Sequence, residues 1–460
     1  MEYIIGSLLL ISFFALVIYA VRGGNLMLGM FVMAVLWTVL PLVGNALVTN
    51  PGFLAANFMN GEGEIVKPTI QEALTKVFQG GPEGWGSVLV NVVFGAWFGR
   101  VLLQTGIAST LIRKTVELGG DKPVIIAVLL SIVTTAIFSS MFGAGAVVAI
   151  GVIILPILIS LGIPKEVAIV SFMFSVGSGM LINPVLTTQF TGFFVDDNGQ
   201  KLMTYADHVR FGLIAMAVQL VITIVYCIFA LRPKRRVHAW SVSNPNKVKM
   251  DFVPNAALLS PVIPVVLLIA FKVPIILGFV IGSLYALAIC GKLKSWRGAA
   301  RVINKDFFDG VVDTAPLVGF LLVLPMFNKA AELCVPYFNA LLGGVIPQST
   351  LVISLAFIVL APLGLFRGPL TLYGGGAAVL GILKGIGFYT PEYLPWLFTL
   401  MLIPSTVMNV TACITQSWVA WGIGYTKVSA RDYLRRSVPL GWISSAILQA
   451  INYFMYGIVR

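Results

Sequence analysis

The chain has 460 residues and a net charge of +12; 58% of the residues are hydrophobic and only 10% are charged. This composition leaves too few polar residues to cover a water-soluble globule, so it excludes a soluble protein and predicts an integral membrane protein. The positive charge would suggest nucleic-acid binding in a soluble protein. Here it is concentrated in short loops, where it reports membrane topology, and no nucleic-acid partner is expected.

Many apolar runs approach or exceed the roughly 20 residues that cross about 30 Å of hydrocarbon, and they show little polar alternation. They predict an all-α polytopic membrane protein. The four cysteines are scattered in apolar segments and there are two histidines, so no cofactor or metal site is expected apart from Na⁺ as a coupling ion. The sequence carries no Walker loop, and we expect neither an ATP-driven pump nor an enzyme.

The first half of the chain is expected to span residues 1–231. It begins with a helical pair at 1–48, which we interpret as part of a scaffold. An acidic, glycine-rich stretch at 49–84 is predicted to be an outer loop. Transport elements are expected over 85–231, beginning with a membrane crossing at 85–105.

Two interrupted segments follow in the first half. Residues 123–162 are predicted to form a re-entrant hairpin, because the serine- and glycine-rich stretch 139–146 is a poor helix centre. Residues 166–195 would then cross the membrane with a break at Asn183, which precedes a proline. The helix 211–231 would return to the cytoplasmic side.

A basic linker, 232–255, is predicted to be cytoplasmic and to separate the two halves, because loops rich in lysine and arginine are retained on that side. The second half covers 256–460. Its scaffold pair is expected at 256–290, and its transport elements at 309–456. A second basic loop, 292–305, is also expected in the cytoplasm.

The transport elements of the second half repeat the order of the first with the sides exchanged. A crossing at 309–327 is followed by an interfacial piece at about 330–344 and a re-entrant hairpin at 348–386. The tip of this hairpin is expected at 365–371. An interrupted segment at 391–424 then crosses inward.

The final helix, 437–456, completes a predicted total of ten crossings and two hairpins. The basic residues that precede it are expected in the cytoplasm. The N-terminus and the C-terminus are therefore both predicted outside, for a protein of a bacterial cytoplasmic (inner) membrane.

Four short matches relate the two halves in the same order. Each half carries an opening proline (Pro164, Pro391), an asparagine (Asn183, Asn409), a Thr-Gln pair (Thr188-Gln189, Thr415-Gln416) and an aspartate before its last helix (Asp207, Asp432). Duplication explains four ordered matches better than chance does. Because the matching segments cross in opposite directions, they form an inverted repeat, which is a recognised plan of secondary transporters.

The hairpin tips and helix breaks are expected to meet near the membrane midplane, where helix N-termini favour anions and freed oxygens suit Na⁺. The alternative is that the small residues there only permit close helix packing. Candidate substrate-binding residues are Ser139, Ser140, Gly143, Asn183, Thr187, Arg367, Gly368, Asn409, Thr411 and Thr415. Candidate ion-binding residues are Ser178, Asn183, Thr188, Ser405, Thr406 and Asn409.

Arg367 lies inside an apolar segment, where an unpaired guanidinium is costly. We predict that it pairs with a substrate carboxylate; the alternative is a shallower hairpin tip from which the side chain reaches the membrane interface. Few acidic residues fall within the membrane on this topology. Their scarcity favours coupling to Na⁺, or to a proton carried with the substrate.

Two stretches resemble the gluconate permease family of the ion transporter superfamily, which also includes citrate and dicarboxylate transporters. They are 94–106, with a basic residue at Arg100, and 409–442, which begins at the asparagine of the second break. In the first break, gluconate permeases carry a His-Pro stretch where this chain has 179–184 without histidine. That departure leaves the sugar-acid substrate and proton coupling open.

This resemblance implies a scaffold of two helical pairs and a unit of hairpins and broken helices that moves as an elevator, in a homodimer. The leading hypothesis is a symporter of a small organic anion, such as a mono- or dicarboxylate or a sugar acid, coupled to Na⁺ or H⁺. The alternatives are a cation/proton antiporter without an organic substrate, and a channel or receptor on the same architecture.

Overall fold

The computed structural model describes residues 2–22, 24–47, 58–59, 65–66, 69–120, 122–196, 200–231, 253–342, 344 and 346–458. Within them the chain is almost entirely helical. The strands assigned there, β1 (Phe58–Met59) and β2 (Ile65–Val66), pair antiparallel as one two-residue ladder. The predicted all-α fold is confirmed. Most of the predicted linker 232–255 lies outside the described residues.

The first half opens with the predicted helical pair, α1 (Glu2–Val21) and α2 (Leu26–Leu47). The predicted outer loop 49–84 is too long, because α3 (Ile70–Leu74), η1 (Thr75–Gly80) and α4 (Gly81–Gly84) run into α5 (Gly86–Gln104) as one 35-residue apolar stretch. A capping box starts this stretch: Thr69 Oγ1 accepts from the Glu72 N–H at 3.2 Å, and the Glu72 carboxylate accepts from the Thr69 N–H at 2.8 Å.

The first hairpin and the first broken helix are present. After α6 (Ile107–Gly119), the hairpin consists of α7 (Pro123–Phe138) and α8 (Ala144–Ser160). The broken helix consists of α9 (Lys165–Met180) and α10 (Pro184–Thr191), whose axes differ by 64°. The half ends with α11 (Tyr205–Ala230).

The second half begins with a pair of short helices. The first member is η2 (Asn255–Val262) continued by α12 (Ile263–Phe271), and the second is α13 (Ile275–Ile289). The predicted crossing 309–327 and interfacial piece 330–344 are not separate, because both belong to the 47-residue helix α14 (Trp296–Leu342). Its three internal prolines, Pro316, Pro325 and Pro336, do not end the helix. In the first half, by contrast, Gly106 takes a φ of +73° and turns the chain between α5 and α6.

The second hairpin and the second broken helix complete the fold. The hairpin contains α15 (Thr350–Val359), η3 (Ala361–Arg367), α16 (Gly376–Leu383) and η4 (Lys384–Phe388). The broken helix contains α17 (Leu394–Ile403), η5 (Pro404–Ala412) and α18 (Ser417–Thr426). It is followed by α19 (Ala430–Asn452) and η6 (Tyr453–Gly457).

Six stretches of the described chain are long and apolar enough to cross a membrane, or eight if each of two bent pairs counts as one span. The ten crossings expected from the sequence include three segments that are not among these stretches. Two of them, 256–271 and 274–290, form helices shorter than a membrane span, and the third is 437–456. The last belongs to α19, whose first turns carry Arg431, Arg435 and Arg436.

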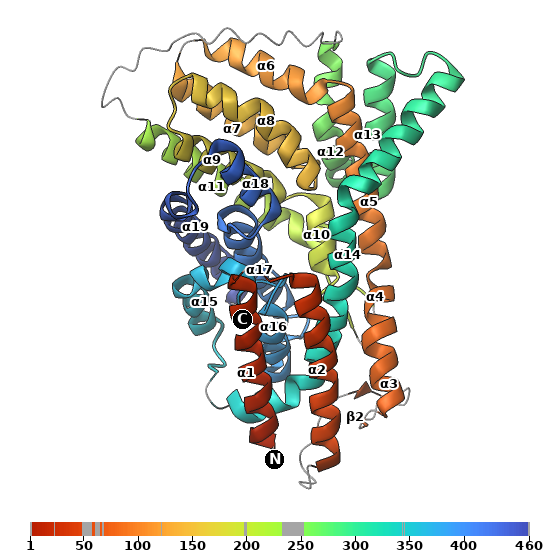
Figure 1. Cartoon of the computed structure of the whole chain (residues 1–460), viewed down its shortest axis with the longest axis vertical. Helices are drawn as coiled ribbons and strands as arrows, with labels where there is room; N and C mark the ends of the chain where they lie inside the picture. The colour runs from red at the N-terminus through yellow and green to blue at the C-terminus, as the bar shows by residue number, and fades with distance from the viewer. Residues whose placement is uncertain are drawn as a thin grey trace.

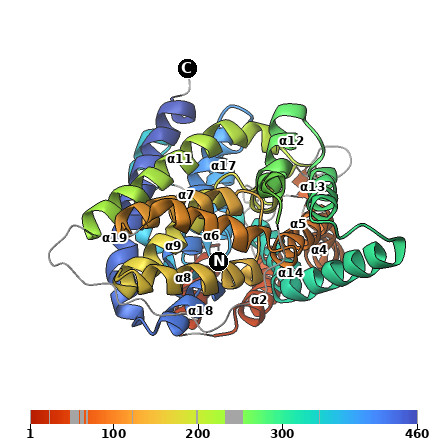
Figure 2. The same ribbon diagram turned by 90° about the horizontal axis from the view of Figure 1, so that it is seen from above.

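The inverted order of the halves is visible in space. In Figure 1, α7 and α8 of the first hairpin lie in the upper part of the molecule, while α15 and α16 of the second lie in the lower part. The pair α1 and α2 is likewise low, and the pair α12 and α13 is high. Long helix α14 contacts α1, α2 and α5, and its N-terminal part projects to one side together with α13 (Figure 2).

Candidate functional site

A pocket of about 340 Å³ lies where the hairpins and broken helices of both halves meet, and we call it the central pocket. Among the described residues, its lining contains no aspartate or glutamate. The residues are Phe142 of the first hairpin tip, Leu186 and Gln189 of α10, Leu317 and Phe320 of α14, Arg367 and Tyr373 of the second hairpin, and Asn409, Val410, Gln416 and Trp418 of the second broken helix. Arg367 and Asn409 are the predicted site residues among them.

The backbone of the second hairpin tip is unusual at Arg367. Phe366 and Arg367 have φ values of 54° and 60°, in the left-handed region that costs a non-glycine residue about 1 kcal/mol or more. The turn packs tightly around them: a Cβ on Gly374 would lie 2.0 Å from the Arg367 carbonyl oxygen, which accepts a hydrogen bond from the Gly375 N–H at 3.1 Å. This strained turn fixes the direction of the Arg367 side chain.

The Arg367 guanidinium is partly buried and makes no ion pair within the described chain. Its Nη2 donates to Gln416 Oε1 at 2.8 Å, and the guanidinium carbon Cζ lies 5.7 Å from the centre of the Phe320 ring. These neutral partners orient the guanidinium but do not cancel its charge. A guanidinium held this way favours an anionic ligand that can accept its remaining N–H groups.

Two glutamines at matching repeat positions both hold the second hairpin. Gln416 accepts from Arg367, and Gln189 Oε1 accepts from the Tyr373 hydroxyl at 2.8 Å. Gln189 Nε2 is buried and has no hydrogen-bond partner among the described residues, so it remains available as a donor. Neither glutamine was proposed as a site residue from the sequence, although the repeated Thr-Gln pair is the signal that marks both.

Asn183 closes the first helix break from inside the protein. Its Oδ1 accepts from the Val185 and Leu186 N–H groups at 2.9 and 3.3 Å, which makes it the N-cap of α10. Its Nδ2 donates to the Phe138 and Met141 carbonyls of the first hairpin tip at 3.0 and 2.9 Å. The side chain is fully buried with all its hydrogen-bonding groups engaged, so it fixes the hairpin to the break.

Asn409 has a different environment, although it occupies the matching place in the repeat. It is fully buried within the π-helical segment η5, and neither Nδ2 nor Oδ1 has a hydrogen-bond partner in the described chain. A buried, unpaired amide is costly unless a ligand or water satisfies it. Asn409 therefore presents both a donor and an acceptor at the wall of the central pocket.

The two helix breaks are consequently not equivalent. The first falls directly before Asn183, but the second falls after η5, at Cys413, where the backbone becomes extended before α18 begins. Gln416 is the N-cap residue of α18 without a side-chain capping bond, because its amide oxygen accepts from Arg367. The two broken helices touch near their breaks: a Cβ on Gly177 would lie 1.9 Å from Thr411 Cγ2.

The other predicted substrate-binding residues lie outside the lining of the central pocket. Gly143 lies at the first hairpin tip with a φ of +110°. Gly368 lies in the second hairpin tip, where an added Cβ would be 2.1 Å from the Leu363 carbonyl oxygen. Thr415 Oγ1 contacts Cys413 Sγ at 2.9 Å. The remaining ones donate their hydroxyls to backbone carbonyls: Ser139, Ser140, Thr187 and Thr411.

The predicted ion-binding hydroxyls divide into two groups. Ser178, Thr188 and Ser405 each donate to the carbonyl four residues earlier in their helices, at 2.7 to 2.8 Å. Thr406 Oγ1 is buried without a hydrogen-bond partner in the part of the chain that the structure describes, and so is Thr371 Oγ1 in the hairpin opposite. The Leu372 N–H donates to Ser405 Oγ at 2.9 Å, which holds this part of the hairpin against η5.

Arg100 lies in a charged cluster with two aspartates of α14. Its Nη2 and Nη1 lie 3.4 Å from carboxylate oxygens of Asp309 and Asp313 on α14. The first hairpin tip packs beside this cluster, since a Cβ on Gly145 would lie 3.2 Å from Asp313 Oδ2. The cluster joins α5 to α14 and does not line the central pocket.

No protein-family model matches the chain, and no curated protein matches its sequence. Among solved structures it is similar to MtrF of Neisseria gonorrhoeae, described as illuminating a class of antimetabolite efflux pumps, with a TM-score of 0.63 and 13% identity over 93% of this chain and 96% of that one. It is also similar to the YdaH transporter of Alcanivorax borkumensis, with a TM-score of 0.62 and 12% identity over 94% and 100% of the two chains.

Identities this low establish the fold alone. Both of these neighbours are described as transport proteins. Neither neighbour is described as a gluconate permease or a citrate transporter, so the similarities do not support the family suggested by the sequence stretches. The YdaH transporter is described as having an unusual topology.

Proposed function

We propose that the chain is a secondary transporter of a small organic anion, a mono- or dicarboxylate or a sugar acid, that binds in the central pocket. The observation that supports this most is Arg367, a partly buried cation without an acidic partner in the described chain, in a pocket lined by no acidic residue. Gln189 Nε2 and Asn409 Nδ2 are further unpaired donors in the lining. A carboxylate satisfies a guanidinium and amide donors together, and a cation would not.

We further propose that Na⁺ or H⁺ is the coupling ion. Asn409 Oδ1 and Thr406 Oγ1 are buried oxygens of η5 that make no hydrogen bond to a described residue, and amide and hydroxyl oxygens are the ligands that a hard cation prefers. A cation bound beside the anion would offset its charge. If Na⁺ binds there, Na⁺ should raise the melting temperature in the presence of the anion, and K⁺ at equal ionic strength should not.

The movement and assembly belong to the same proposal. The hairpins and broken helices would move as an elevator against a scaffold that includes α1, α2, α12 and α13, in a homodimer within a bacterial cytoplasmic membrane, with basic loops inside and both termini outside. Contacts between α9 and η5 join the broken helices of the two halves, as such a unit requires. MtrF is described as an efflux pump, so export of the anion is the alternative direction.

Two other functions are separable by experiment. A cation/proton antiporter would move ions without an organic anion, and a channel or receptor would not concentrate one. The lining of the central pocket favours neither, because it offers a fixed positive charge without a titratable acid.

The test is a thermal-stability screen of the purified protein against a panel of carboxylates, with and without Na⁺. A ligand that binds only the folded state at 100 times its Kd stabilises it by about 2.7 kcal/mol, which raises the melting temperature measurably. We expect at least one carboxylate to stabilise the protein while its neutral amide analogue does not. If amides stabilise the protein as well as carboxylates do, recognition of an anion is refuted.

A further inference from the structure

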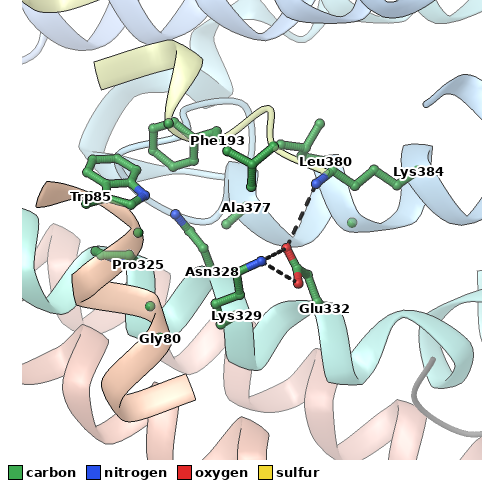
Figure 3. Close-up of a pocket in the computed structure, with 15 residues that line it drawn as sticks. Gly80, Trp85, Phe193, Pro325, Asn328, Lys329, Glu332, Ala377, Leu380 and Lys384 are labelled. Carbon is green, nitrogen blue, oxygen red and sulfur yellow. Dashed lines mark hydrogen bonds and ion pairs between the residues drawn. The ribbon is translucent and has the colours of Figure 1, made fainter. Parts of the chain in front are cut away.

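One aspartate of α14 is buried without a partner. Asp306 is 2% exposed, and its Oδ2 makes no hydrogen bond to a described residue. Glu332 of the same helix is held differently: it lines a pocket of about 660 Å³, where it lies 3.0 Å from Lys329 Nζ and 3.9 Å from Lys384 Nζ (Figure 3). A buried carboxylate without such partners is strongly unfavourable in its charged form and is neutralised by a proton instead.

Asp306 belongs to a row of three carboxylates that faces α5. Asp306, Asp309 and Asp313 are three and four residues apart, so they lie along one face of α14. Gly310 shows that this face contacts α5, because a Cβ there would lie 2.9 Å from the backbone nitrogen of Trp97. The row therefore lies where a helix of the first half meets a helix of the second.

A second buried polar group at this contact also has no partner. Trp97 is 5% exposed, and its Nε1 donates to no described residue. Its ring lies beside the residue that follows Asp306 in the sequence, since the ring centroids of Trp97 and Phe307 are 5.8 Å apart. The contact between α5 and α14 thus buries an unpaired donor as well as an unpaired carboxylate oxygen, which close helix packing alone does not require.

Arg100 contacts two of the three carboxylates. Its Nη2 and Nη1 lie 3.4 Å from oxygens of Asp309 and Asp313, respectively, which is longer than the roughly 2.7 to 2.9 Å of a tight charge-assisted hydrogen bond. Its Nε is buried and makes no hydrogen bond within the described chain. The guanidinium is therefore held loosely, and it makes no ion pair with Asp306.

The surroundings of Asp306 act on its charge in opposite directions. Burial from water and the neighbouring Asp309 favour its protonated form. Lys305 on α14, Arg100 on α5 and Lys292 after α13 are cations that favour its ionised form. They are the charged groups of the described chain that lie close enough to act on it. Opposed effects of this kind make both forms accessible, as a residue that takes up and releases a proton requires.

The row of carboxylates reaches the wall of the central pocket. Leu317, which lines that pocket, is one helical turn after Asp313. The first hairpin tip touches both places, because a Cβ on Gly145 would lie 3.2 Å from Asp313 Oδ2, and Phe142 of the same tip lines the pocket. A change in the contact between Arg100 and Asp313 is therefore adjacent to the place where the substrate would bind.

We infer that Asp306 binds the proton that couples transport. When Asp306 is protonated, Arg100 stays with Asp309 and Asp313, as in the structure. When the proton passes from the carboxyl oxygen to water, Asp306 becomes a third carboxylate that attracts Arg100, which loosens the contact with Asp313 beside the first hairpin tip. The inference rests on the proposed function for its substrate, and within that function it selects H⁺ over Na⁺ as the coupling ion.

The first test separates coupling from substrate binding. Asp306→Asn keeps the shape of the side chain and resembles its protonated form. Each protein is reconstituted in proteoliposomes with the carboxylate found in the stability screen. We expect Asp306→Asn to lose accumulation driven by a pH gradient and to keep exchange of labelled for unlabelled substrate at equal pH. Glu117→Gln is the matched control, since this acid of α6 has 65% of its side chain exposed, and it should keep both activities.

The outcomes of this test are distinguishable. Accumulation by Asp306→Asn at the level of the unmodified protein overturns the inference and leaves the proposed function standing. Accumulation that a Na⁺ gradient drives and a pH gradient does not has the same consequence. Absence of exchange in the unmodified protein refutes the proposed function, and the coupling role of Asp306 with it.

A measurement without substrate detects the proton itself. The aspartate carboxyl groups are labelled with ¹³C, and the infrared C=O band of protonated carboxylic acids is followed against pH in H₂O and D₂O. We expect the unmodified protein to show a labelled band at neutral pH that disappears at alkaline pH, and Asp306→Asn to lack it. If that variant does not fold, Asp306→Glu should move the band to the unlabelled frequency. Absence of the band from the unmodified protein, or a labelled band that survives either substitution, overturns the inference.

Discussion

Replacing Arg367 with glutamine removes the charge on which the proposed recognition depends and keeps a polar side chain of similar reach. The guanidinium donates one hydrogen bond to Gln416 and has further N–H groups that face the central pocket. A hydrogen bond between charged groups contributes about 1.5 to 3 kcal/mol. Losing two such bonds, with partial replacement by an amide, should weaken carboxylate binding by about 3 kcal/mol, or about 150-fold in Kd.

The unliganded protein should tolerate this change. Arg367 has no ion pair to lose within the described chain, and an amide at this position can still donate to Gln416. We expect the melting temperature without ligand to stay the same or to rise, since a desolvated charge is removed.

The assay is equilibrium binding of the carboxylate that stabilises the protein most in the screen, measured beside the melting temperature. Arg113→Gln is the control, because Arg113 lies on α6 with 56% of its side chain exposed and pairs only with Glu117 at 3.7 Å among the described residues. A Kd for Arg367→Gln within about threefold of that control, in a folded protein, would refute the role of Arg367.

Three further changes test the site. Gln416→Glu should place a carboxylate that pairs with Arg367 and competes with the substrate. Substrate binding should therefore weaken at least about 30-fold with no decrease in melting temperature. A lower melting temperature with intact substrate binding would contradict this. Asn183→Ala should lower the free energy of unfolding by about 3 kcal/mol in denaturant unfolding, since it removes a helix cap and unpairs two buried carbonyls. Asn409→Ala should lower it by under about 1 kcal/mol but weaken ligand or ion binding. Equal losses of unfolding free energy in the two variants would refute the distinction. Gly177→Ala should lower the unfolding free energy by about 2 kcal/mol, because the added methyl group clashes with Thr411 Cγ2. Adding Thr411→Ser should restore most of that stability. If the double variant is as unstable as Gly177→Ala alone, the clash with Thr411 is not the cause.

The membrane class, the hairpins and the helix breaks could be read from the sequence because each has a local signal. Long apolar runs predict helices, serine and glycine interrupt them at 139–146, and Asn183 before a proline marks a helix start. Arg367 stood out because a charge in an apolar run needs a partner. These signals are properties of the chain itself and do not depend on which segments later pack together.

The uses of the two asparagines depend on packing, and the sequence alone could not distinguish them. Asn183 is engaged because the first hairpin tip brings the Phe138 and Met141 carbonyls to it, while no carbonyl of the described residues reaches Asn409. The π-helical turns of η5 also shift the second break to residues after Asn409. A π-helix has no reliable pattern in sequence, so the repeat suggested an equivalence that the structure does not have.

Elsewhere the composition of a segment misled the prediction of its structure. Gly80, Gly81 and Gly84 suggested a loop, but they lie in the helical segments η1 and α4, where Gly81 packs against the Pro325 carbonyl of α14. A crossing was predicted to end at residue 327, yet α14 continues to Leu342 and packs against α2 and α5. Gln189 and Gln416 were visible as a repeated pair, and only the position of Arg367 and Tyr373 beside them shows their role.

The central claim, that the chain is an ion-coupled carrier of an organic anion, is tested most directly in proteoliposomes. The carboxylate found in the stability screen is supplied as a radiolabel at equal concentration on both sides, and a Na⁺ or pH gradient is then imposed. The account predicts that one of the two gradients drives the label above its equilibrium concentration on one side, and that Arg367→Gln abolishes this accumulation. Label that only equilibrates, or accumulation that survives Arg367→Gln, would contradict it.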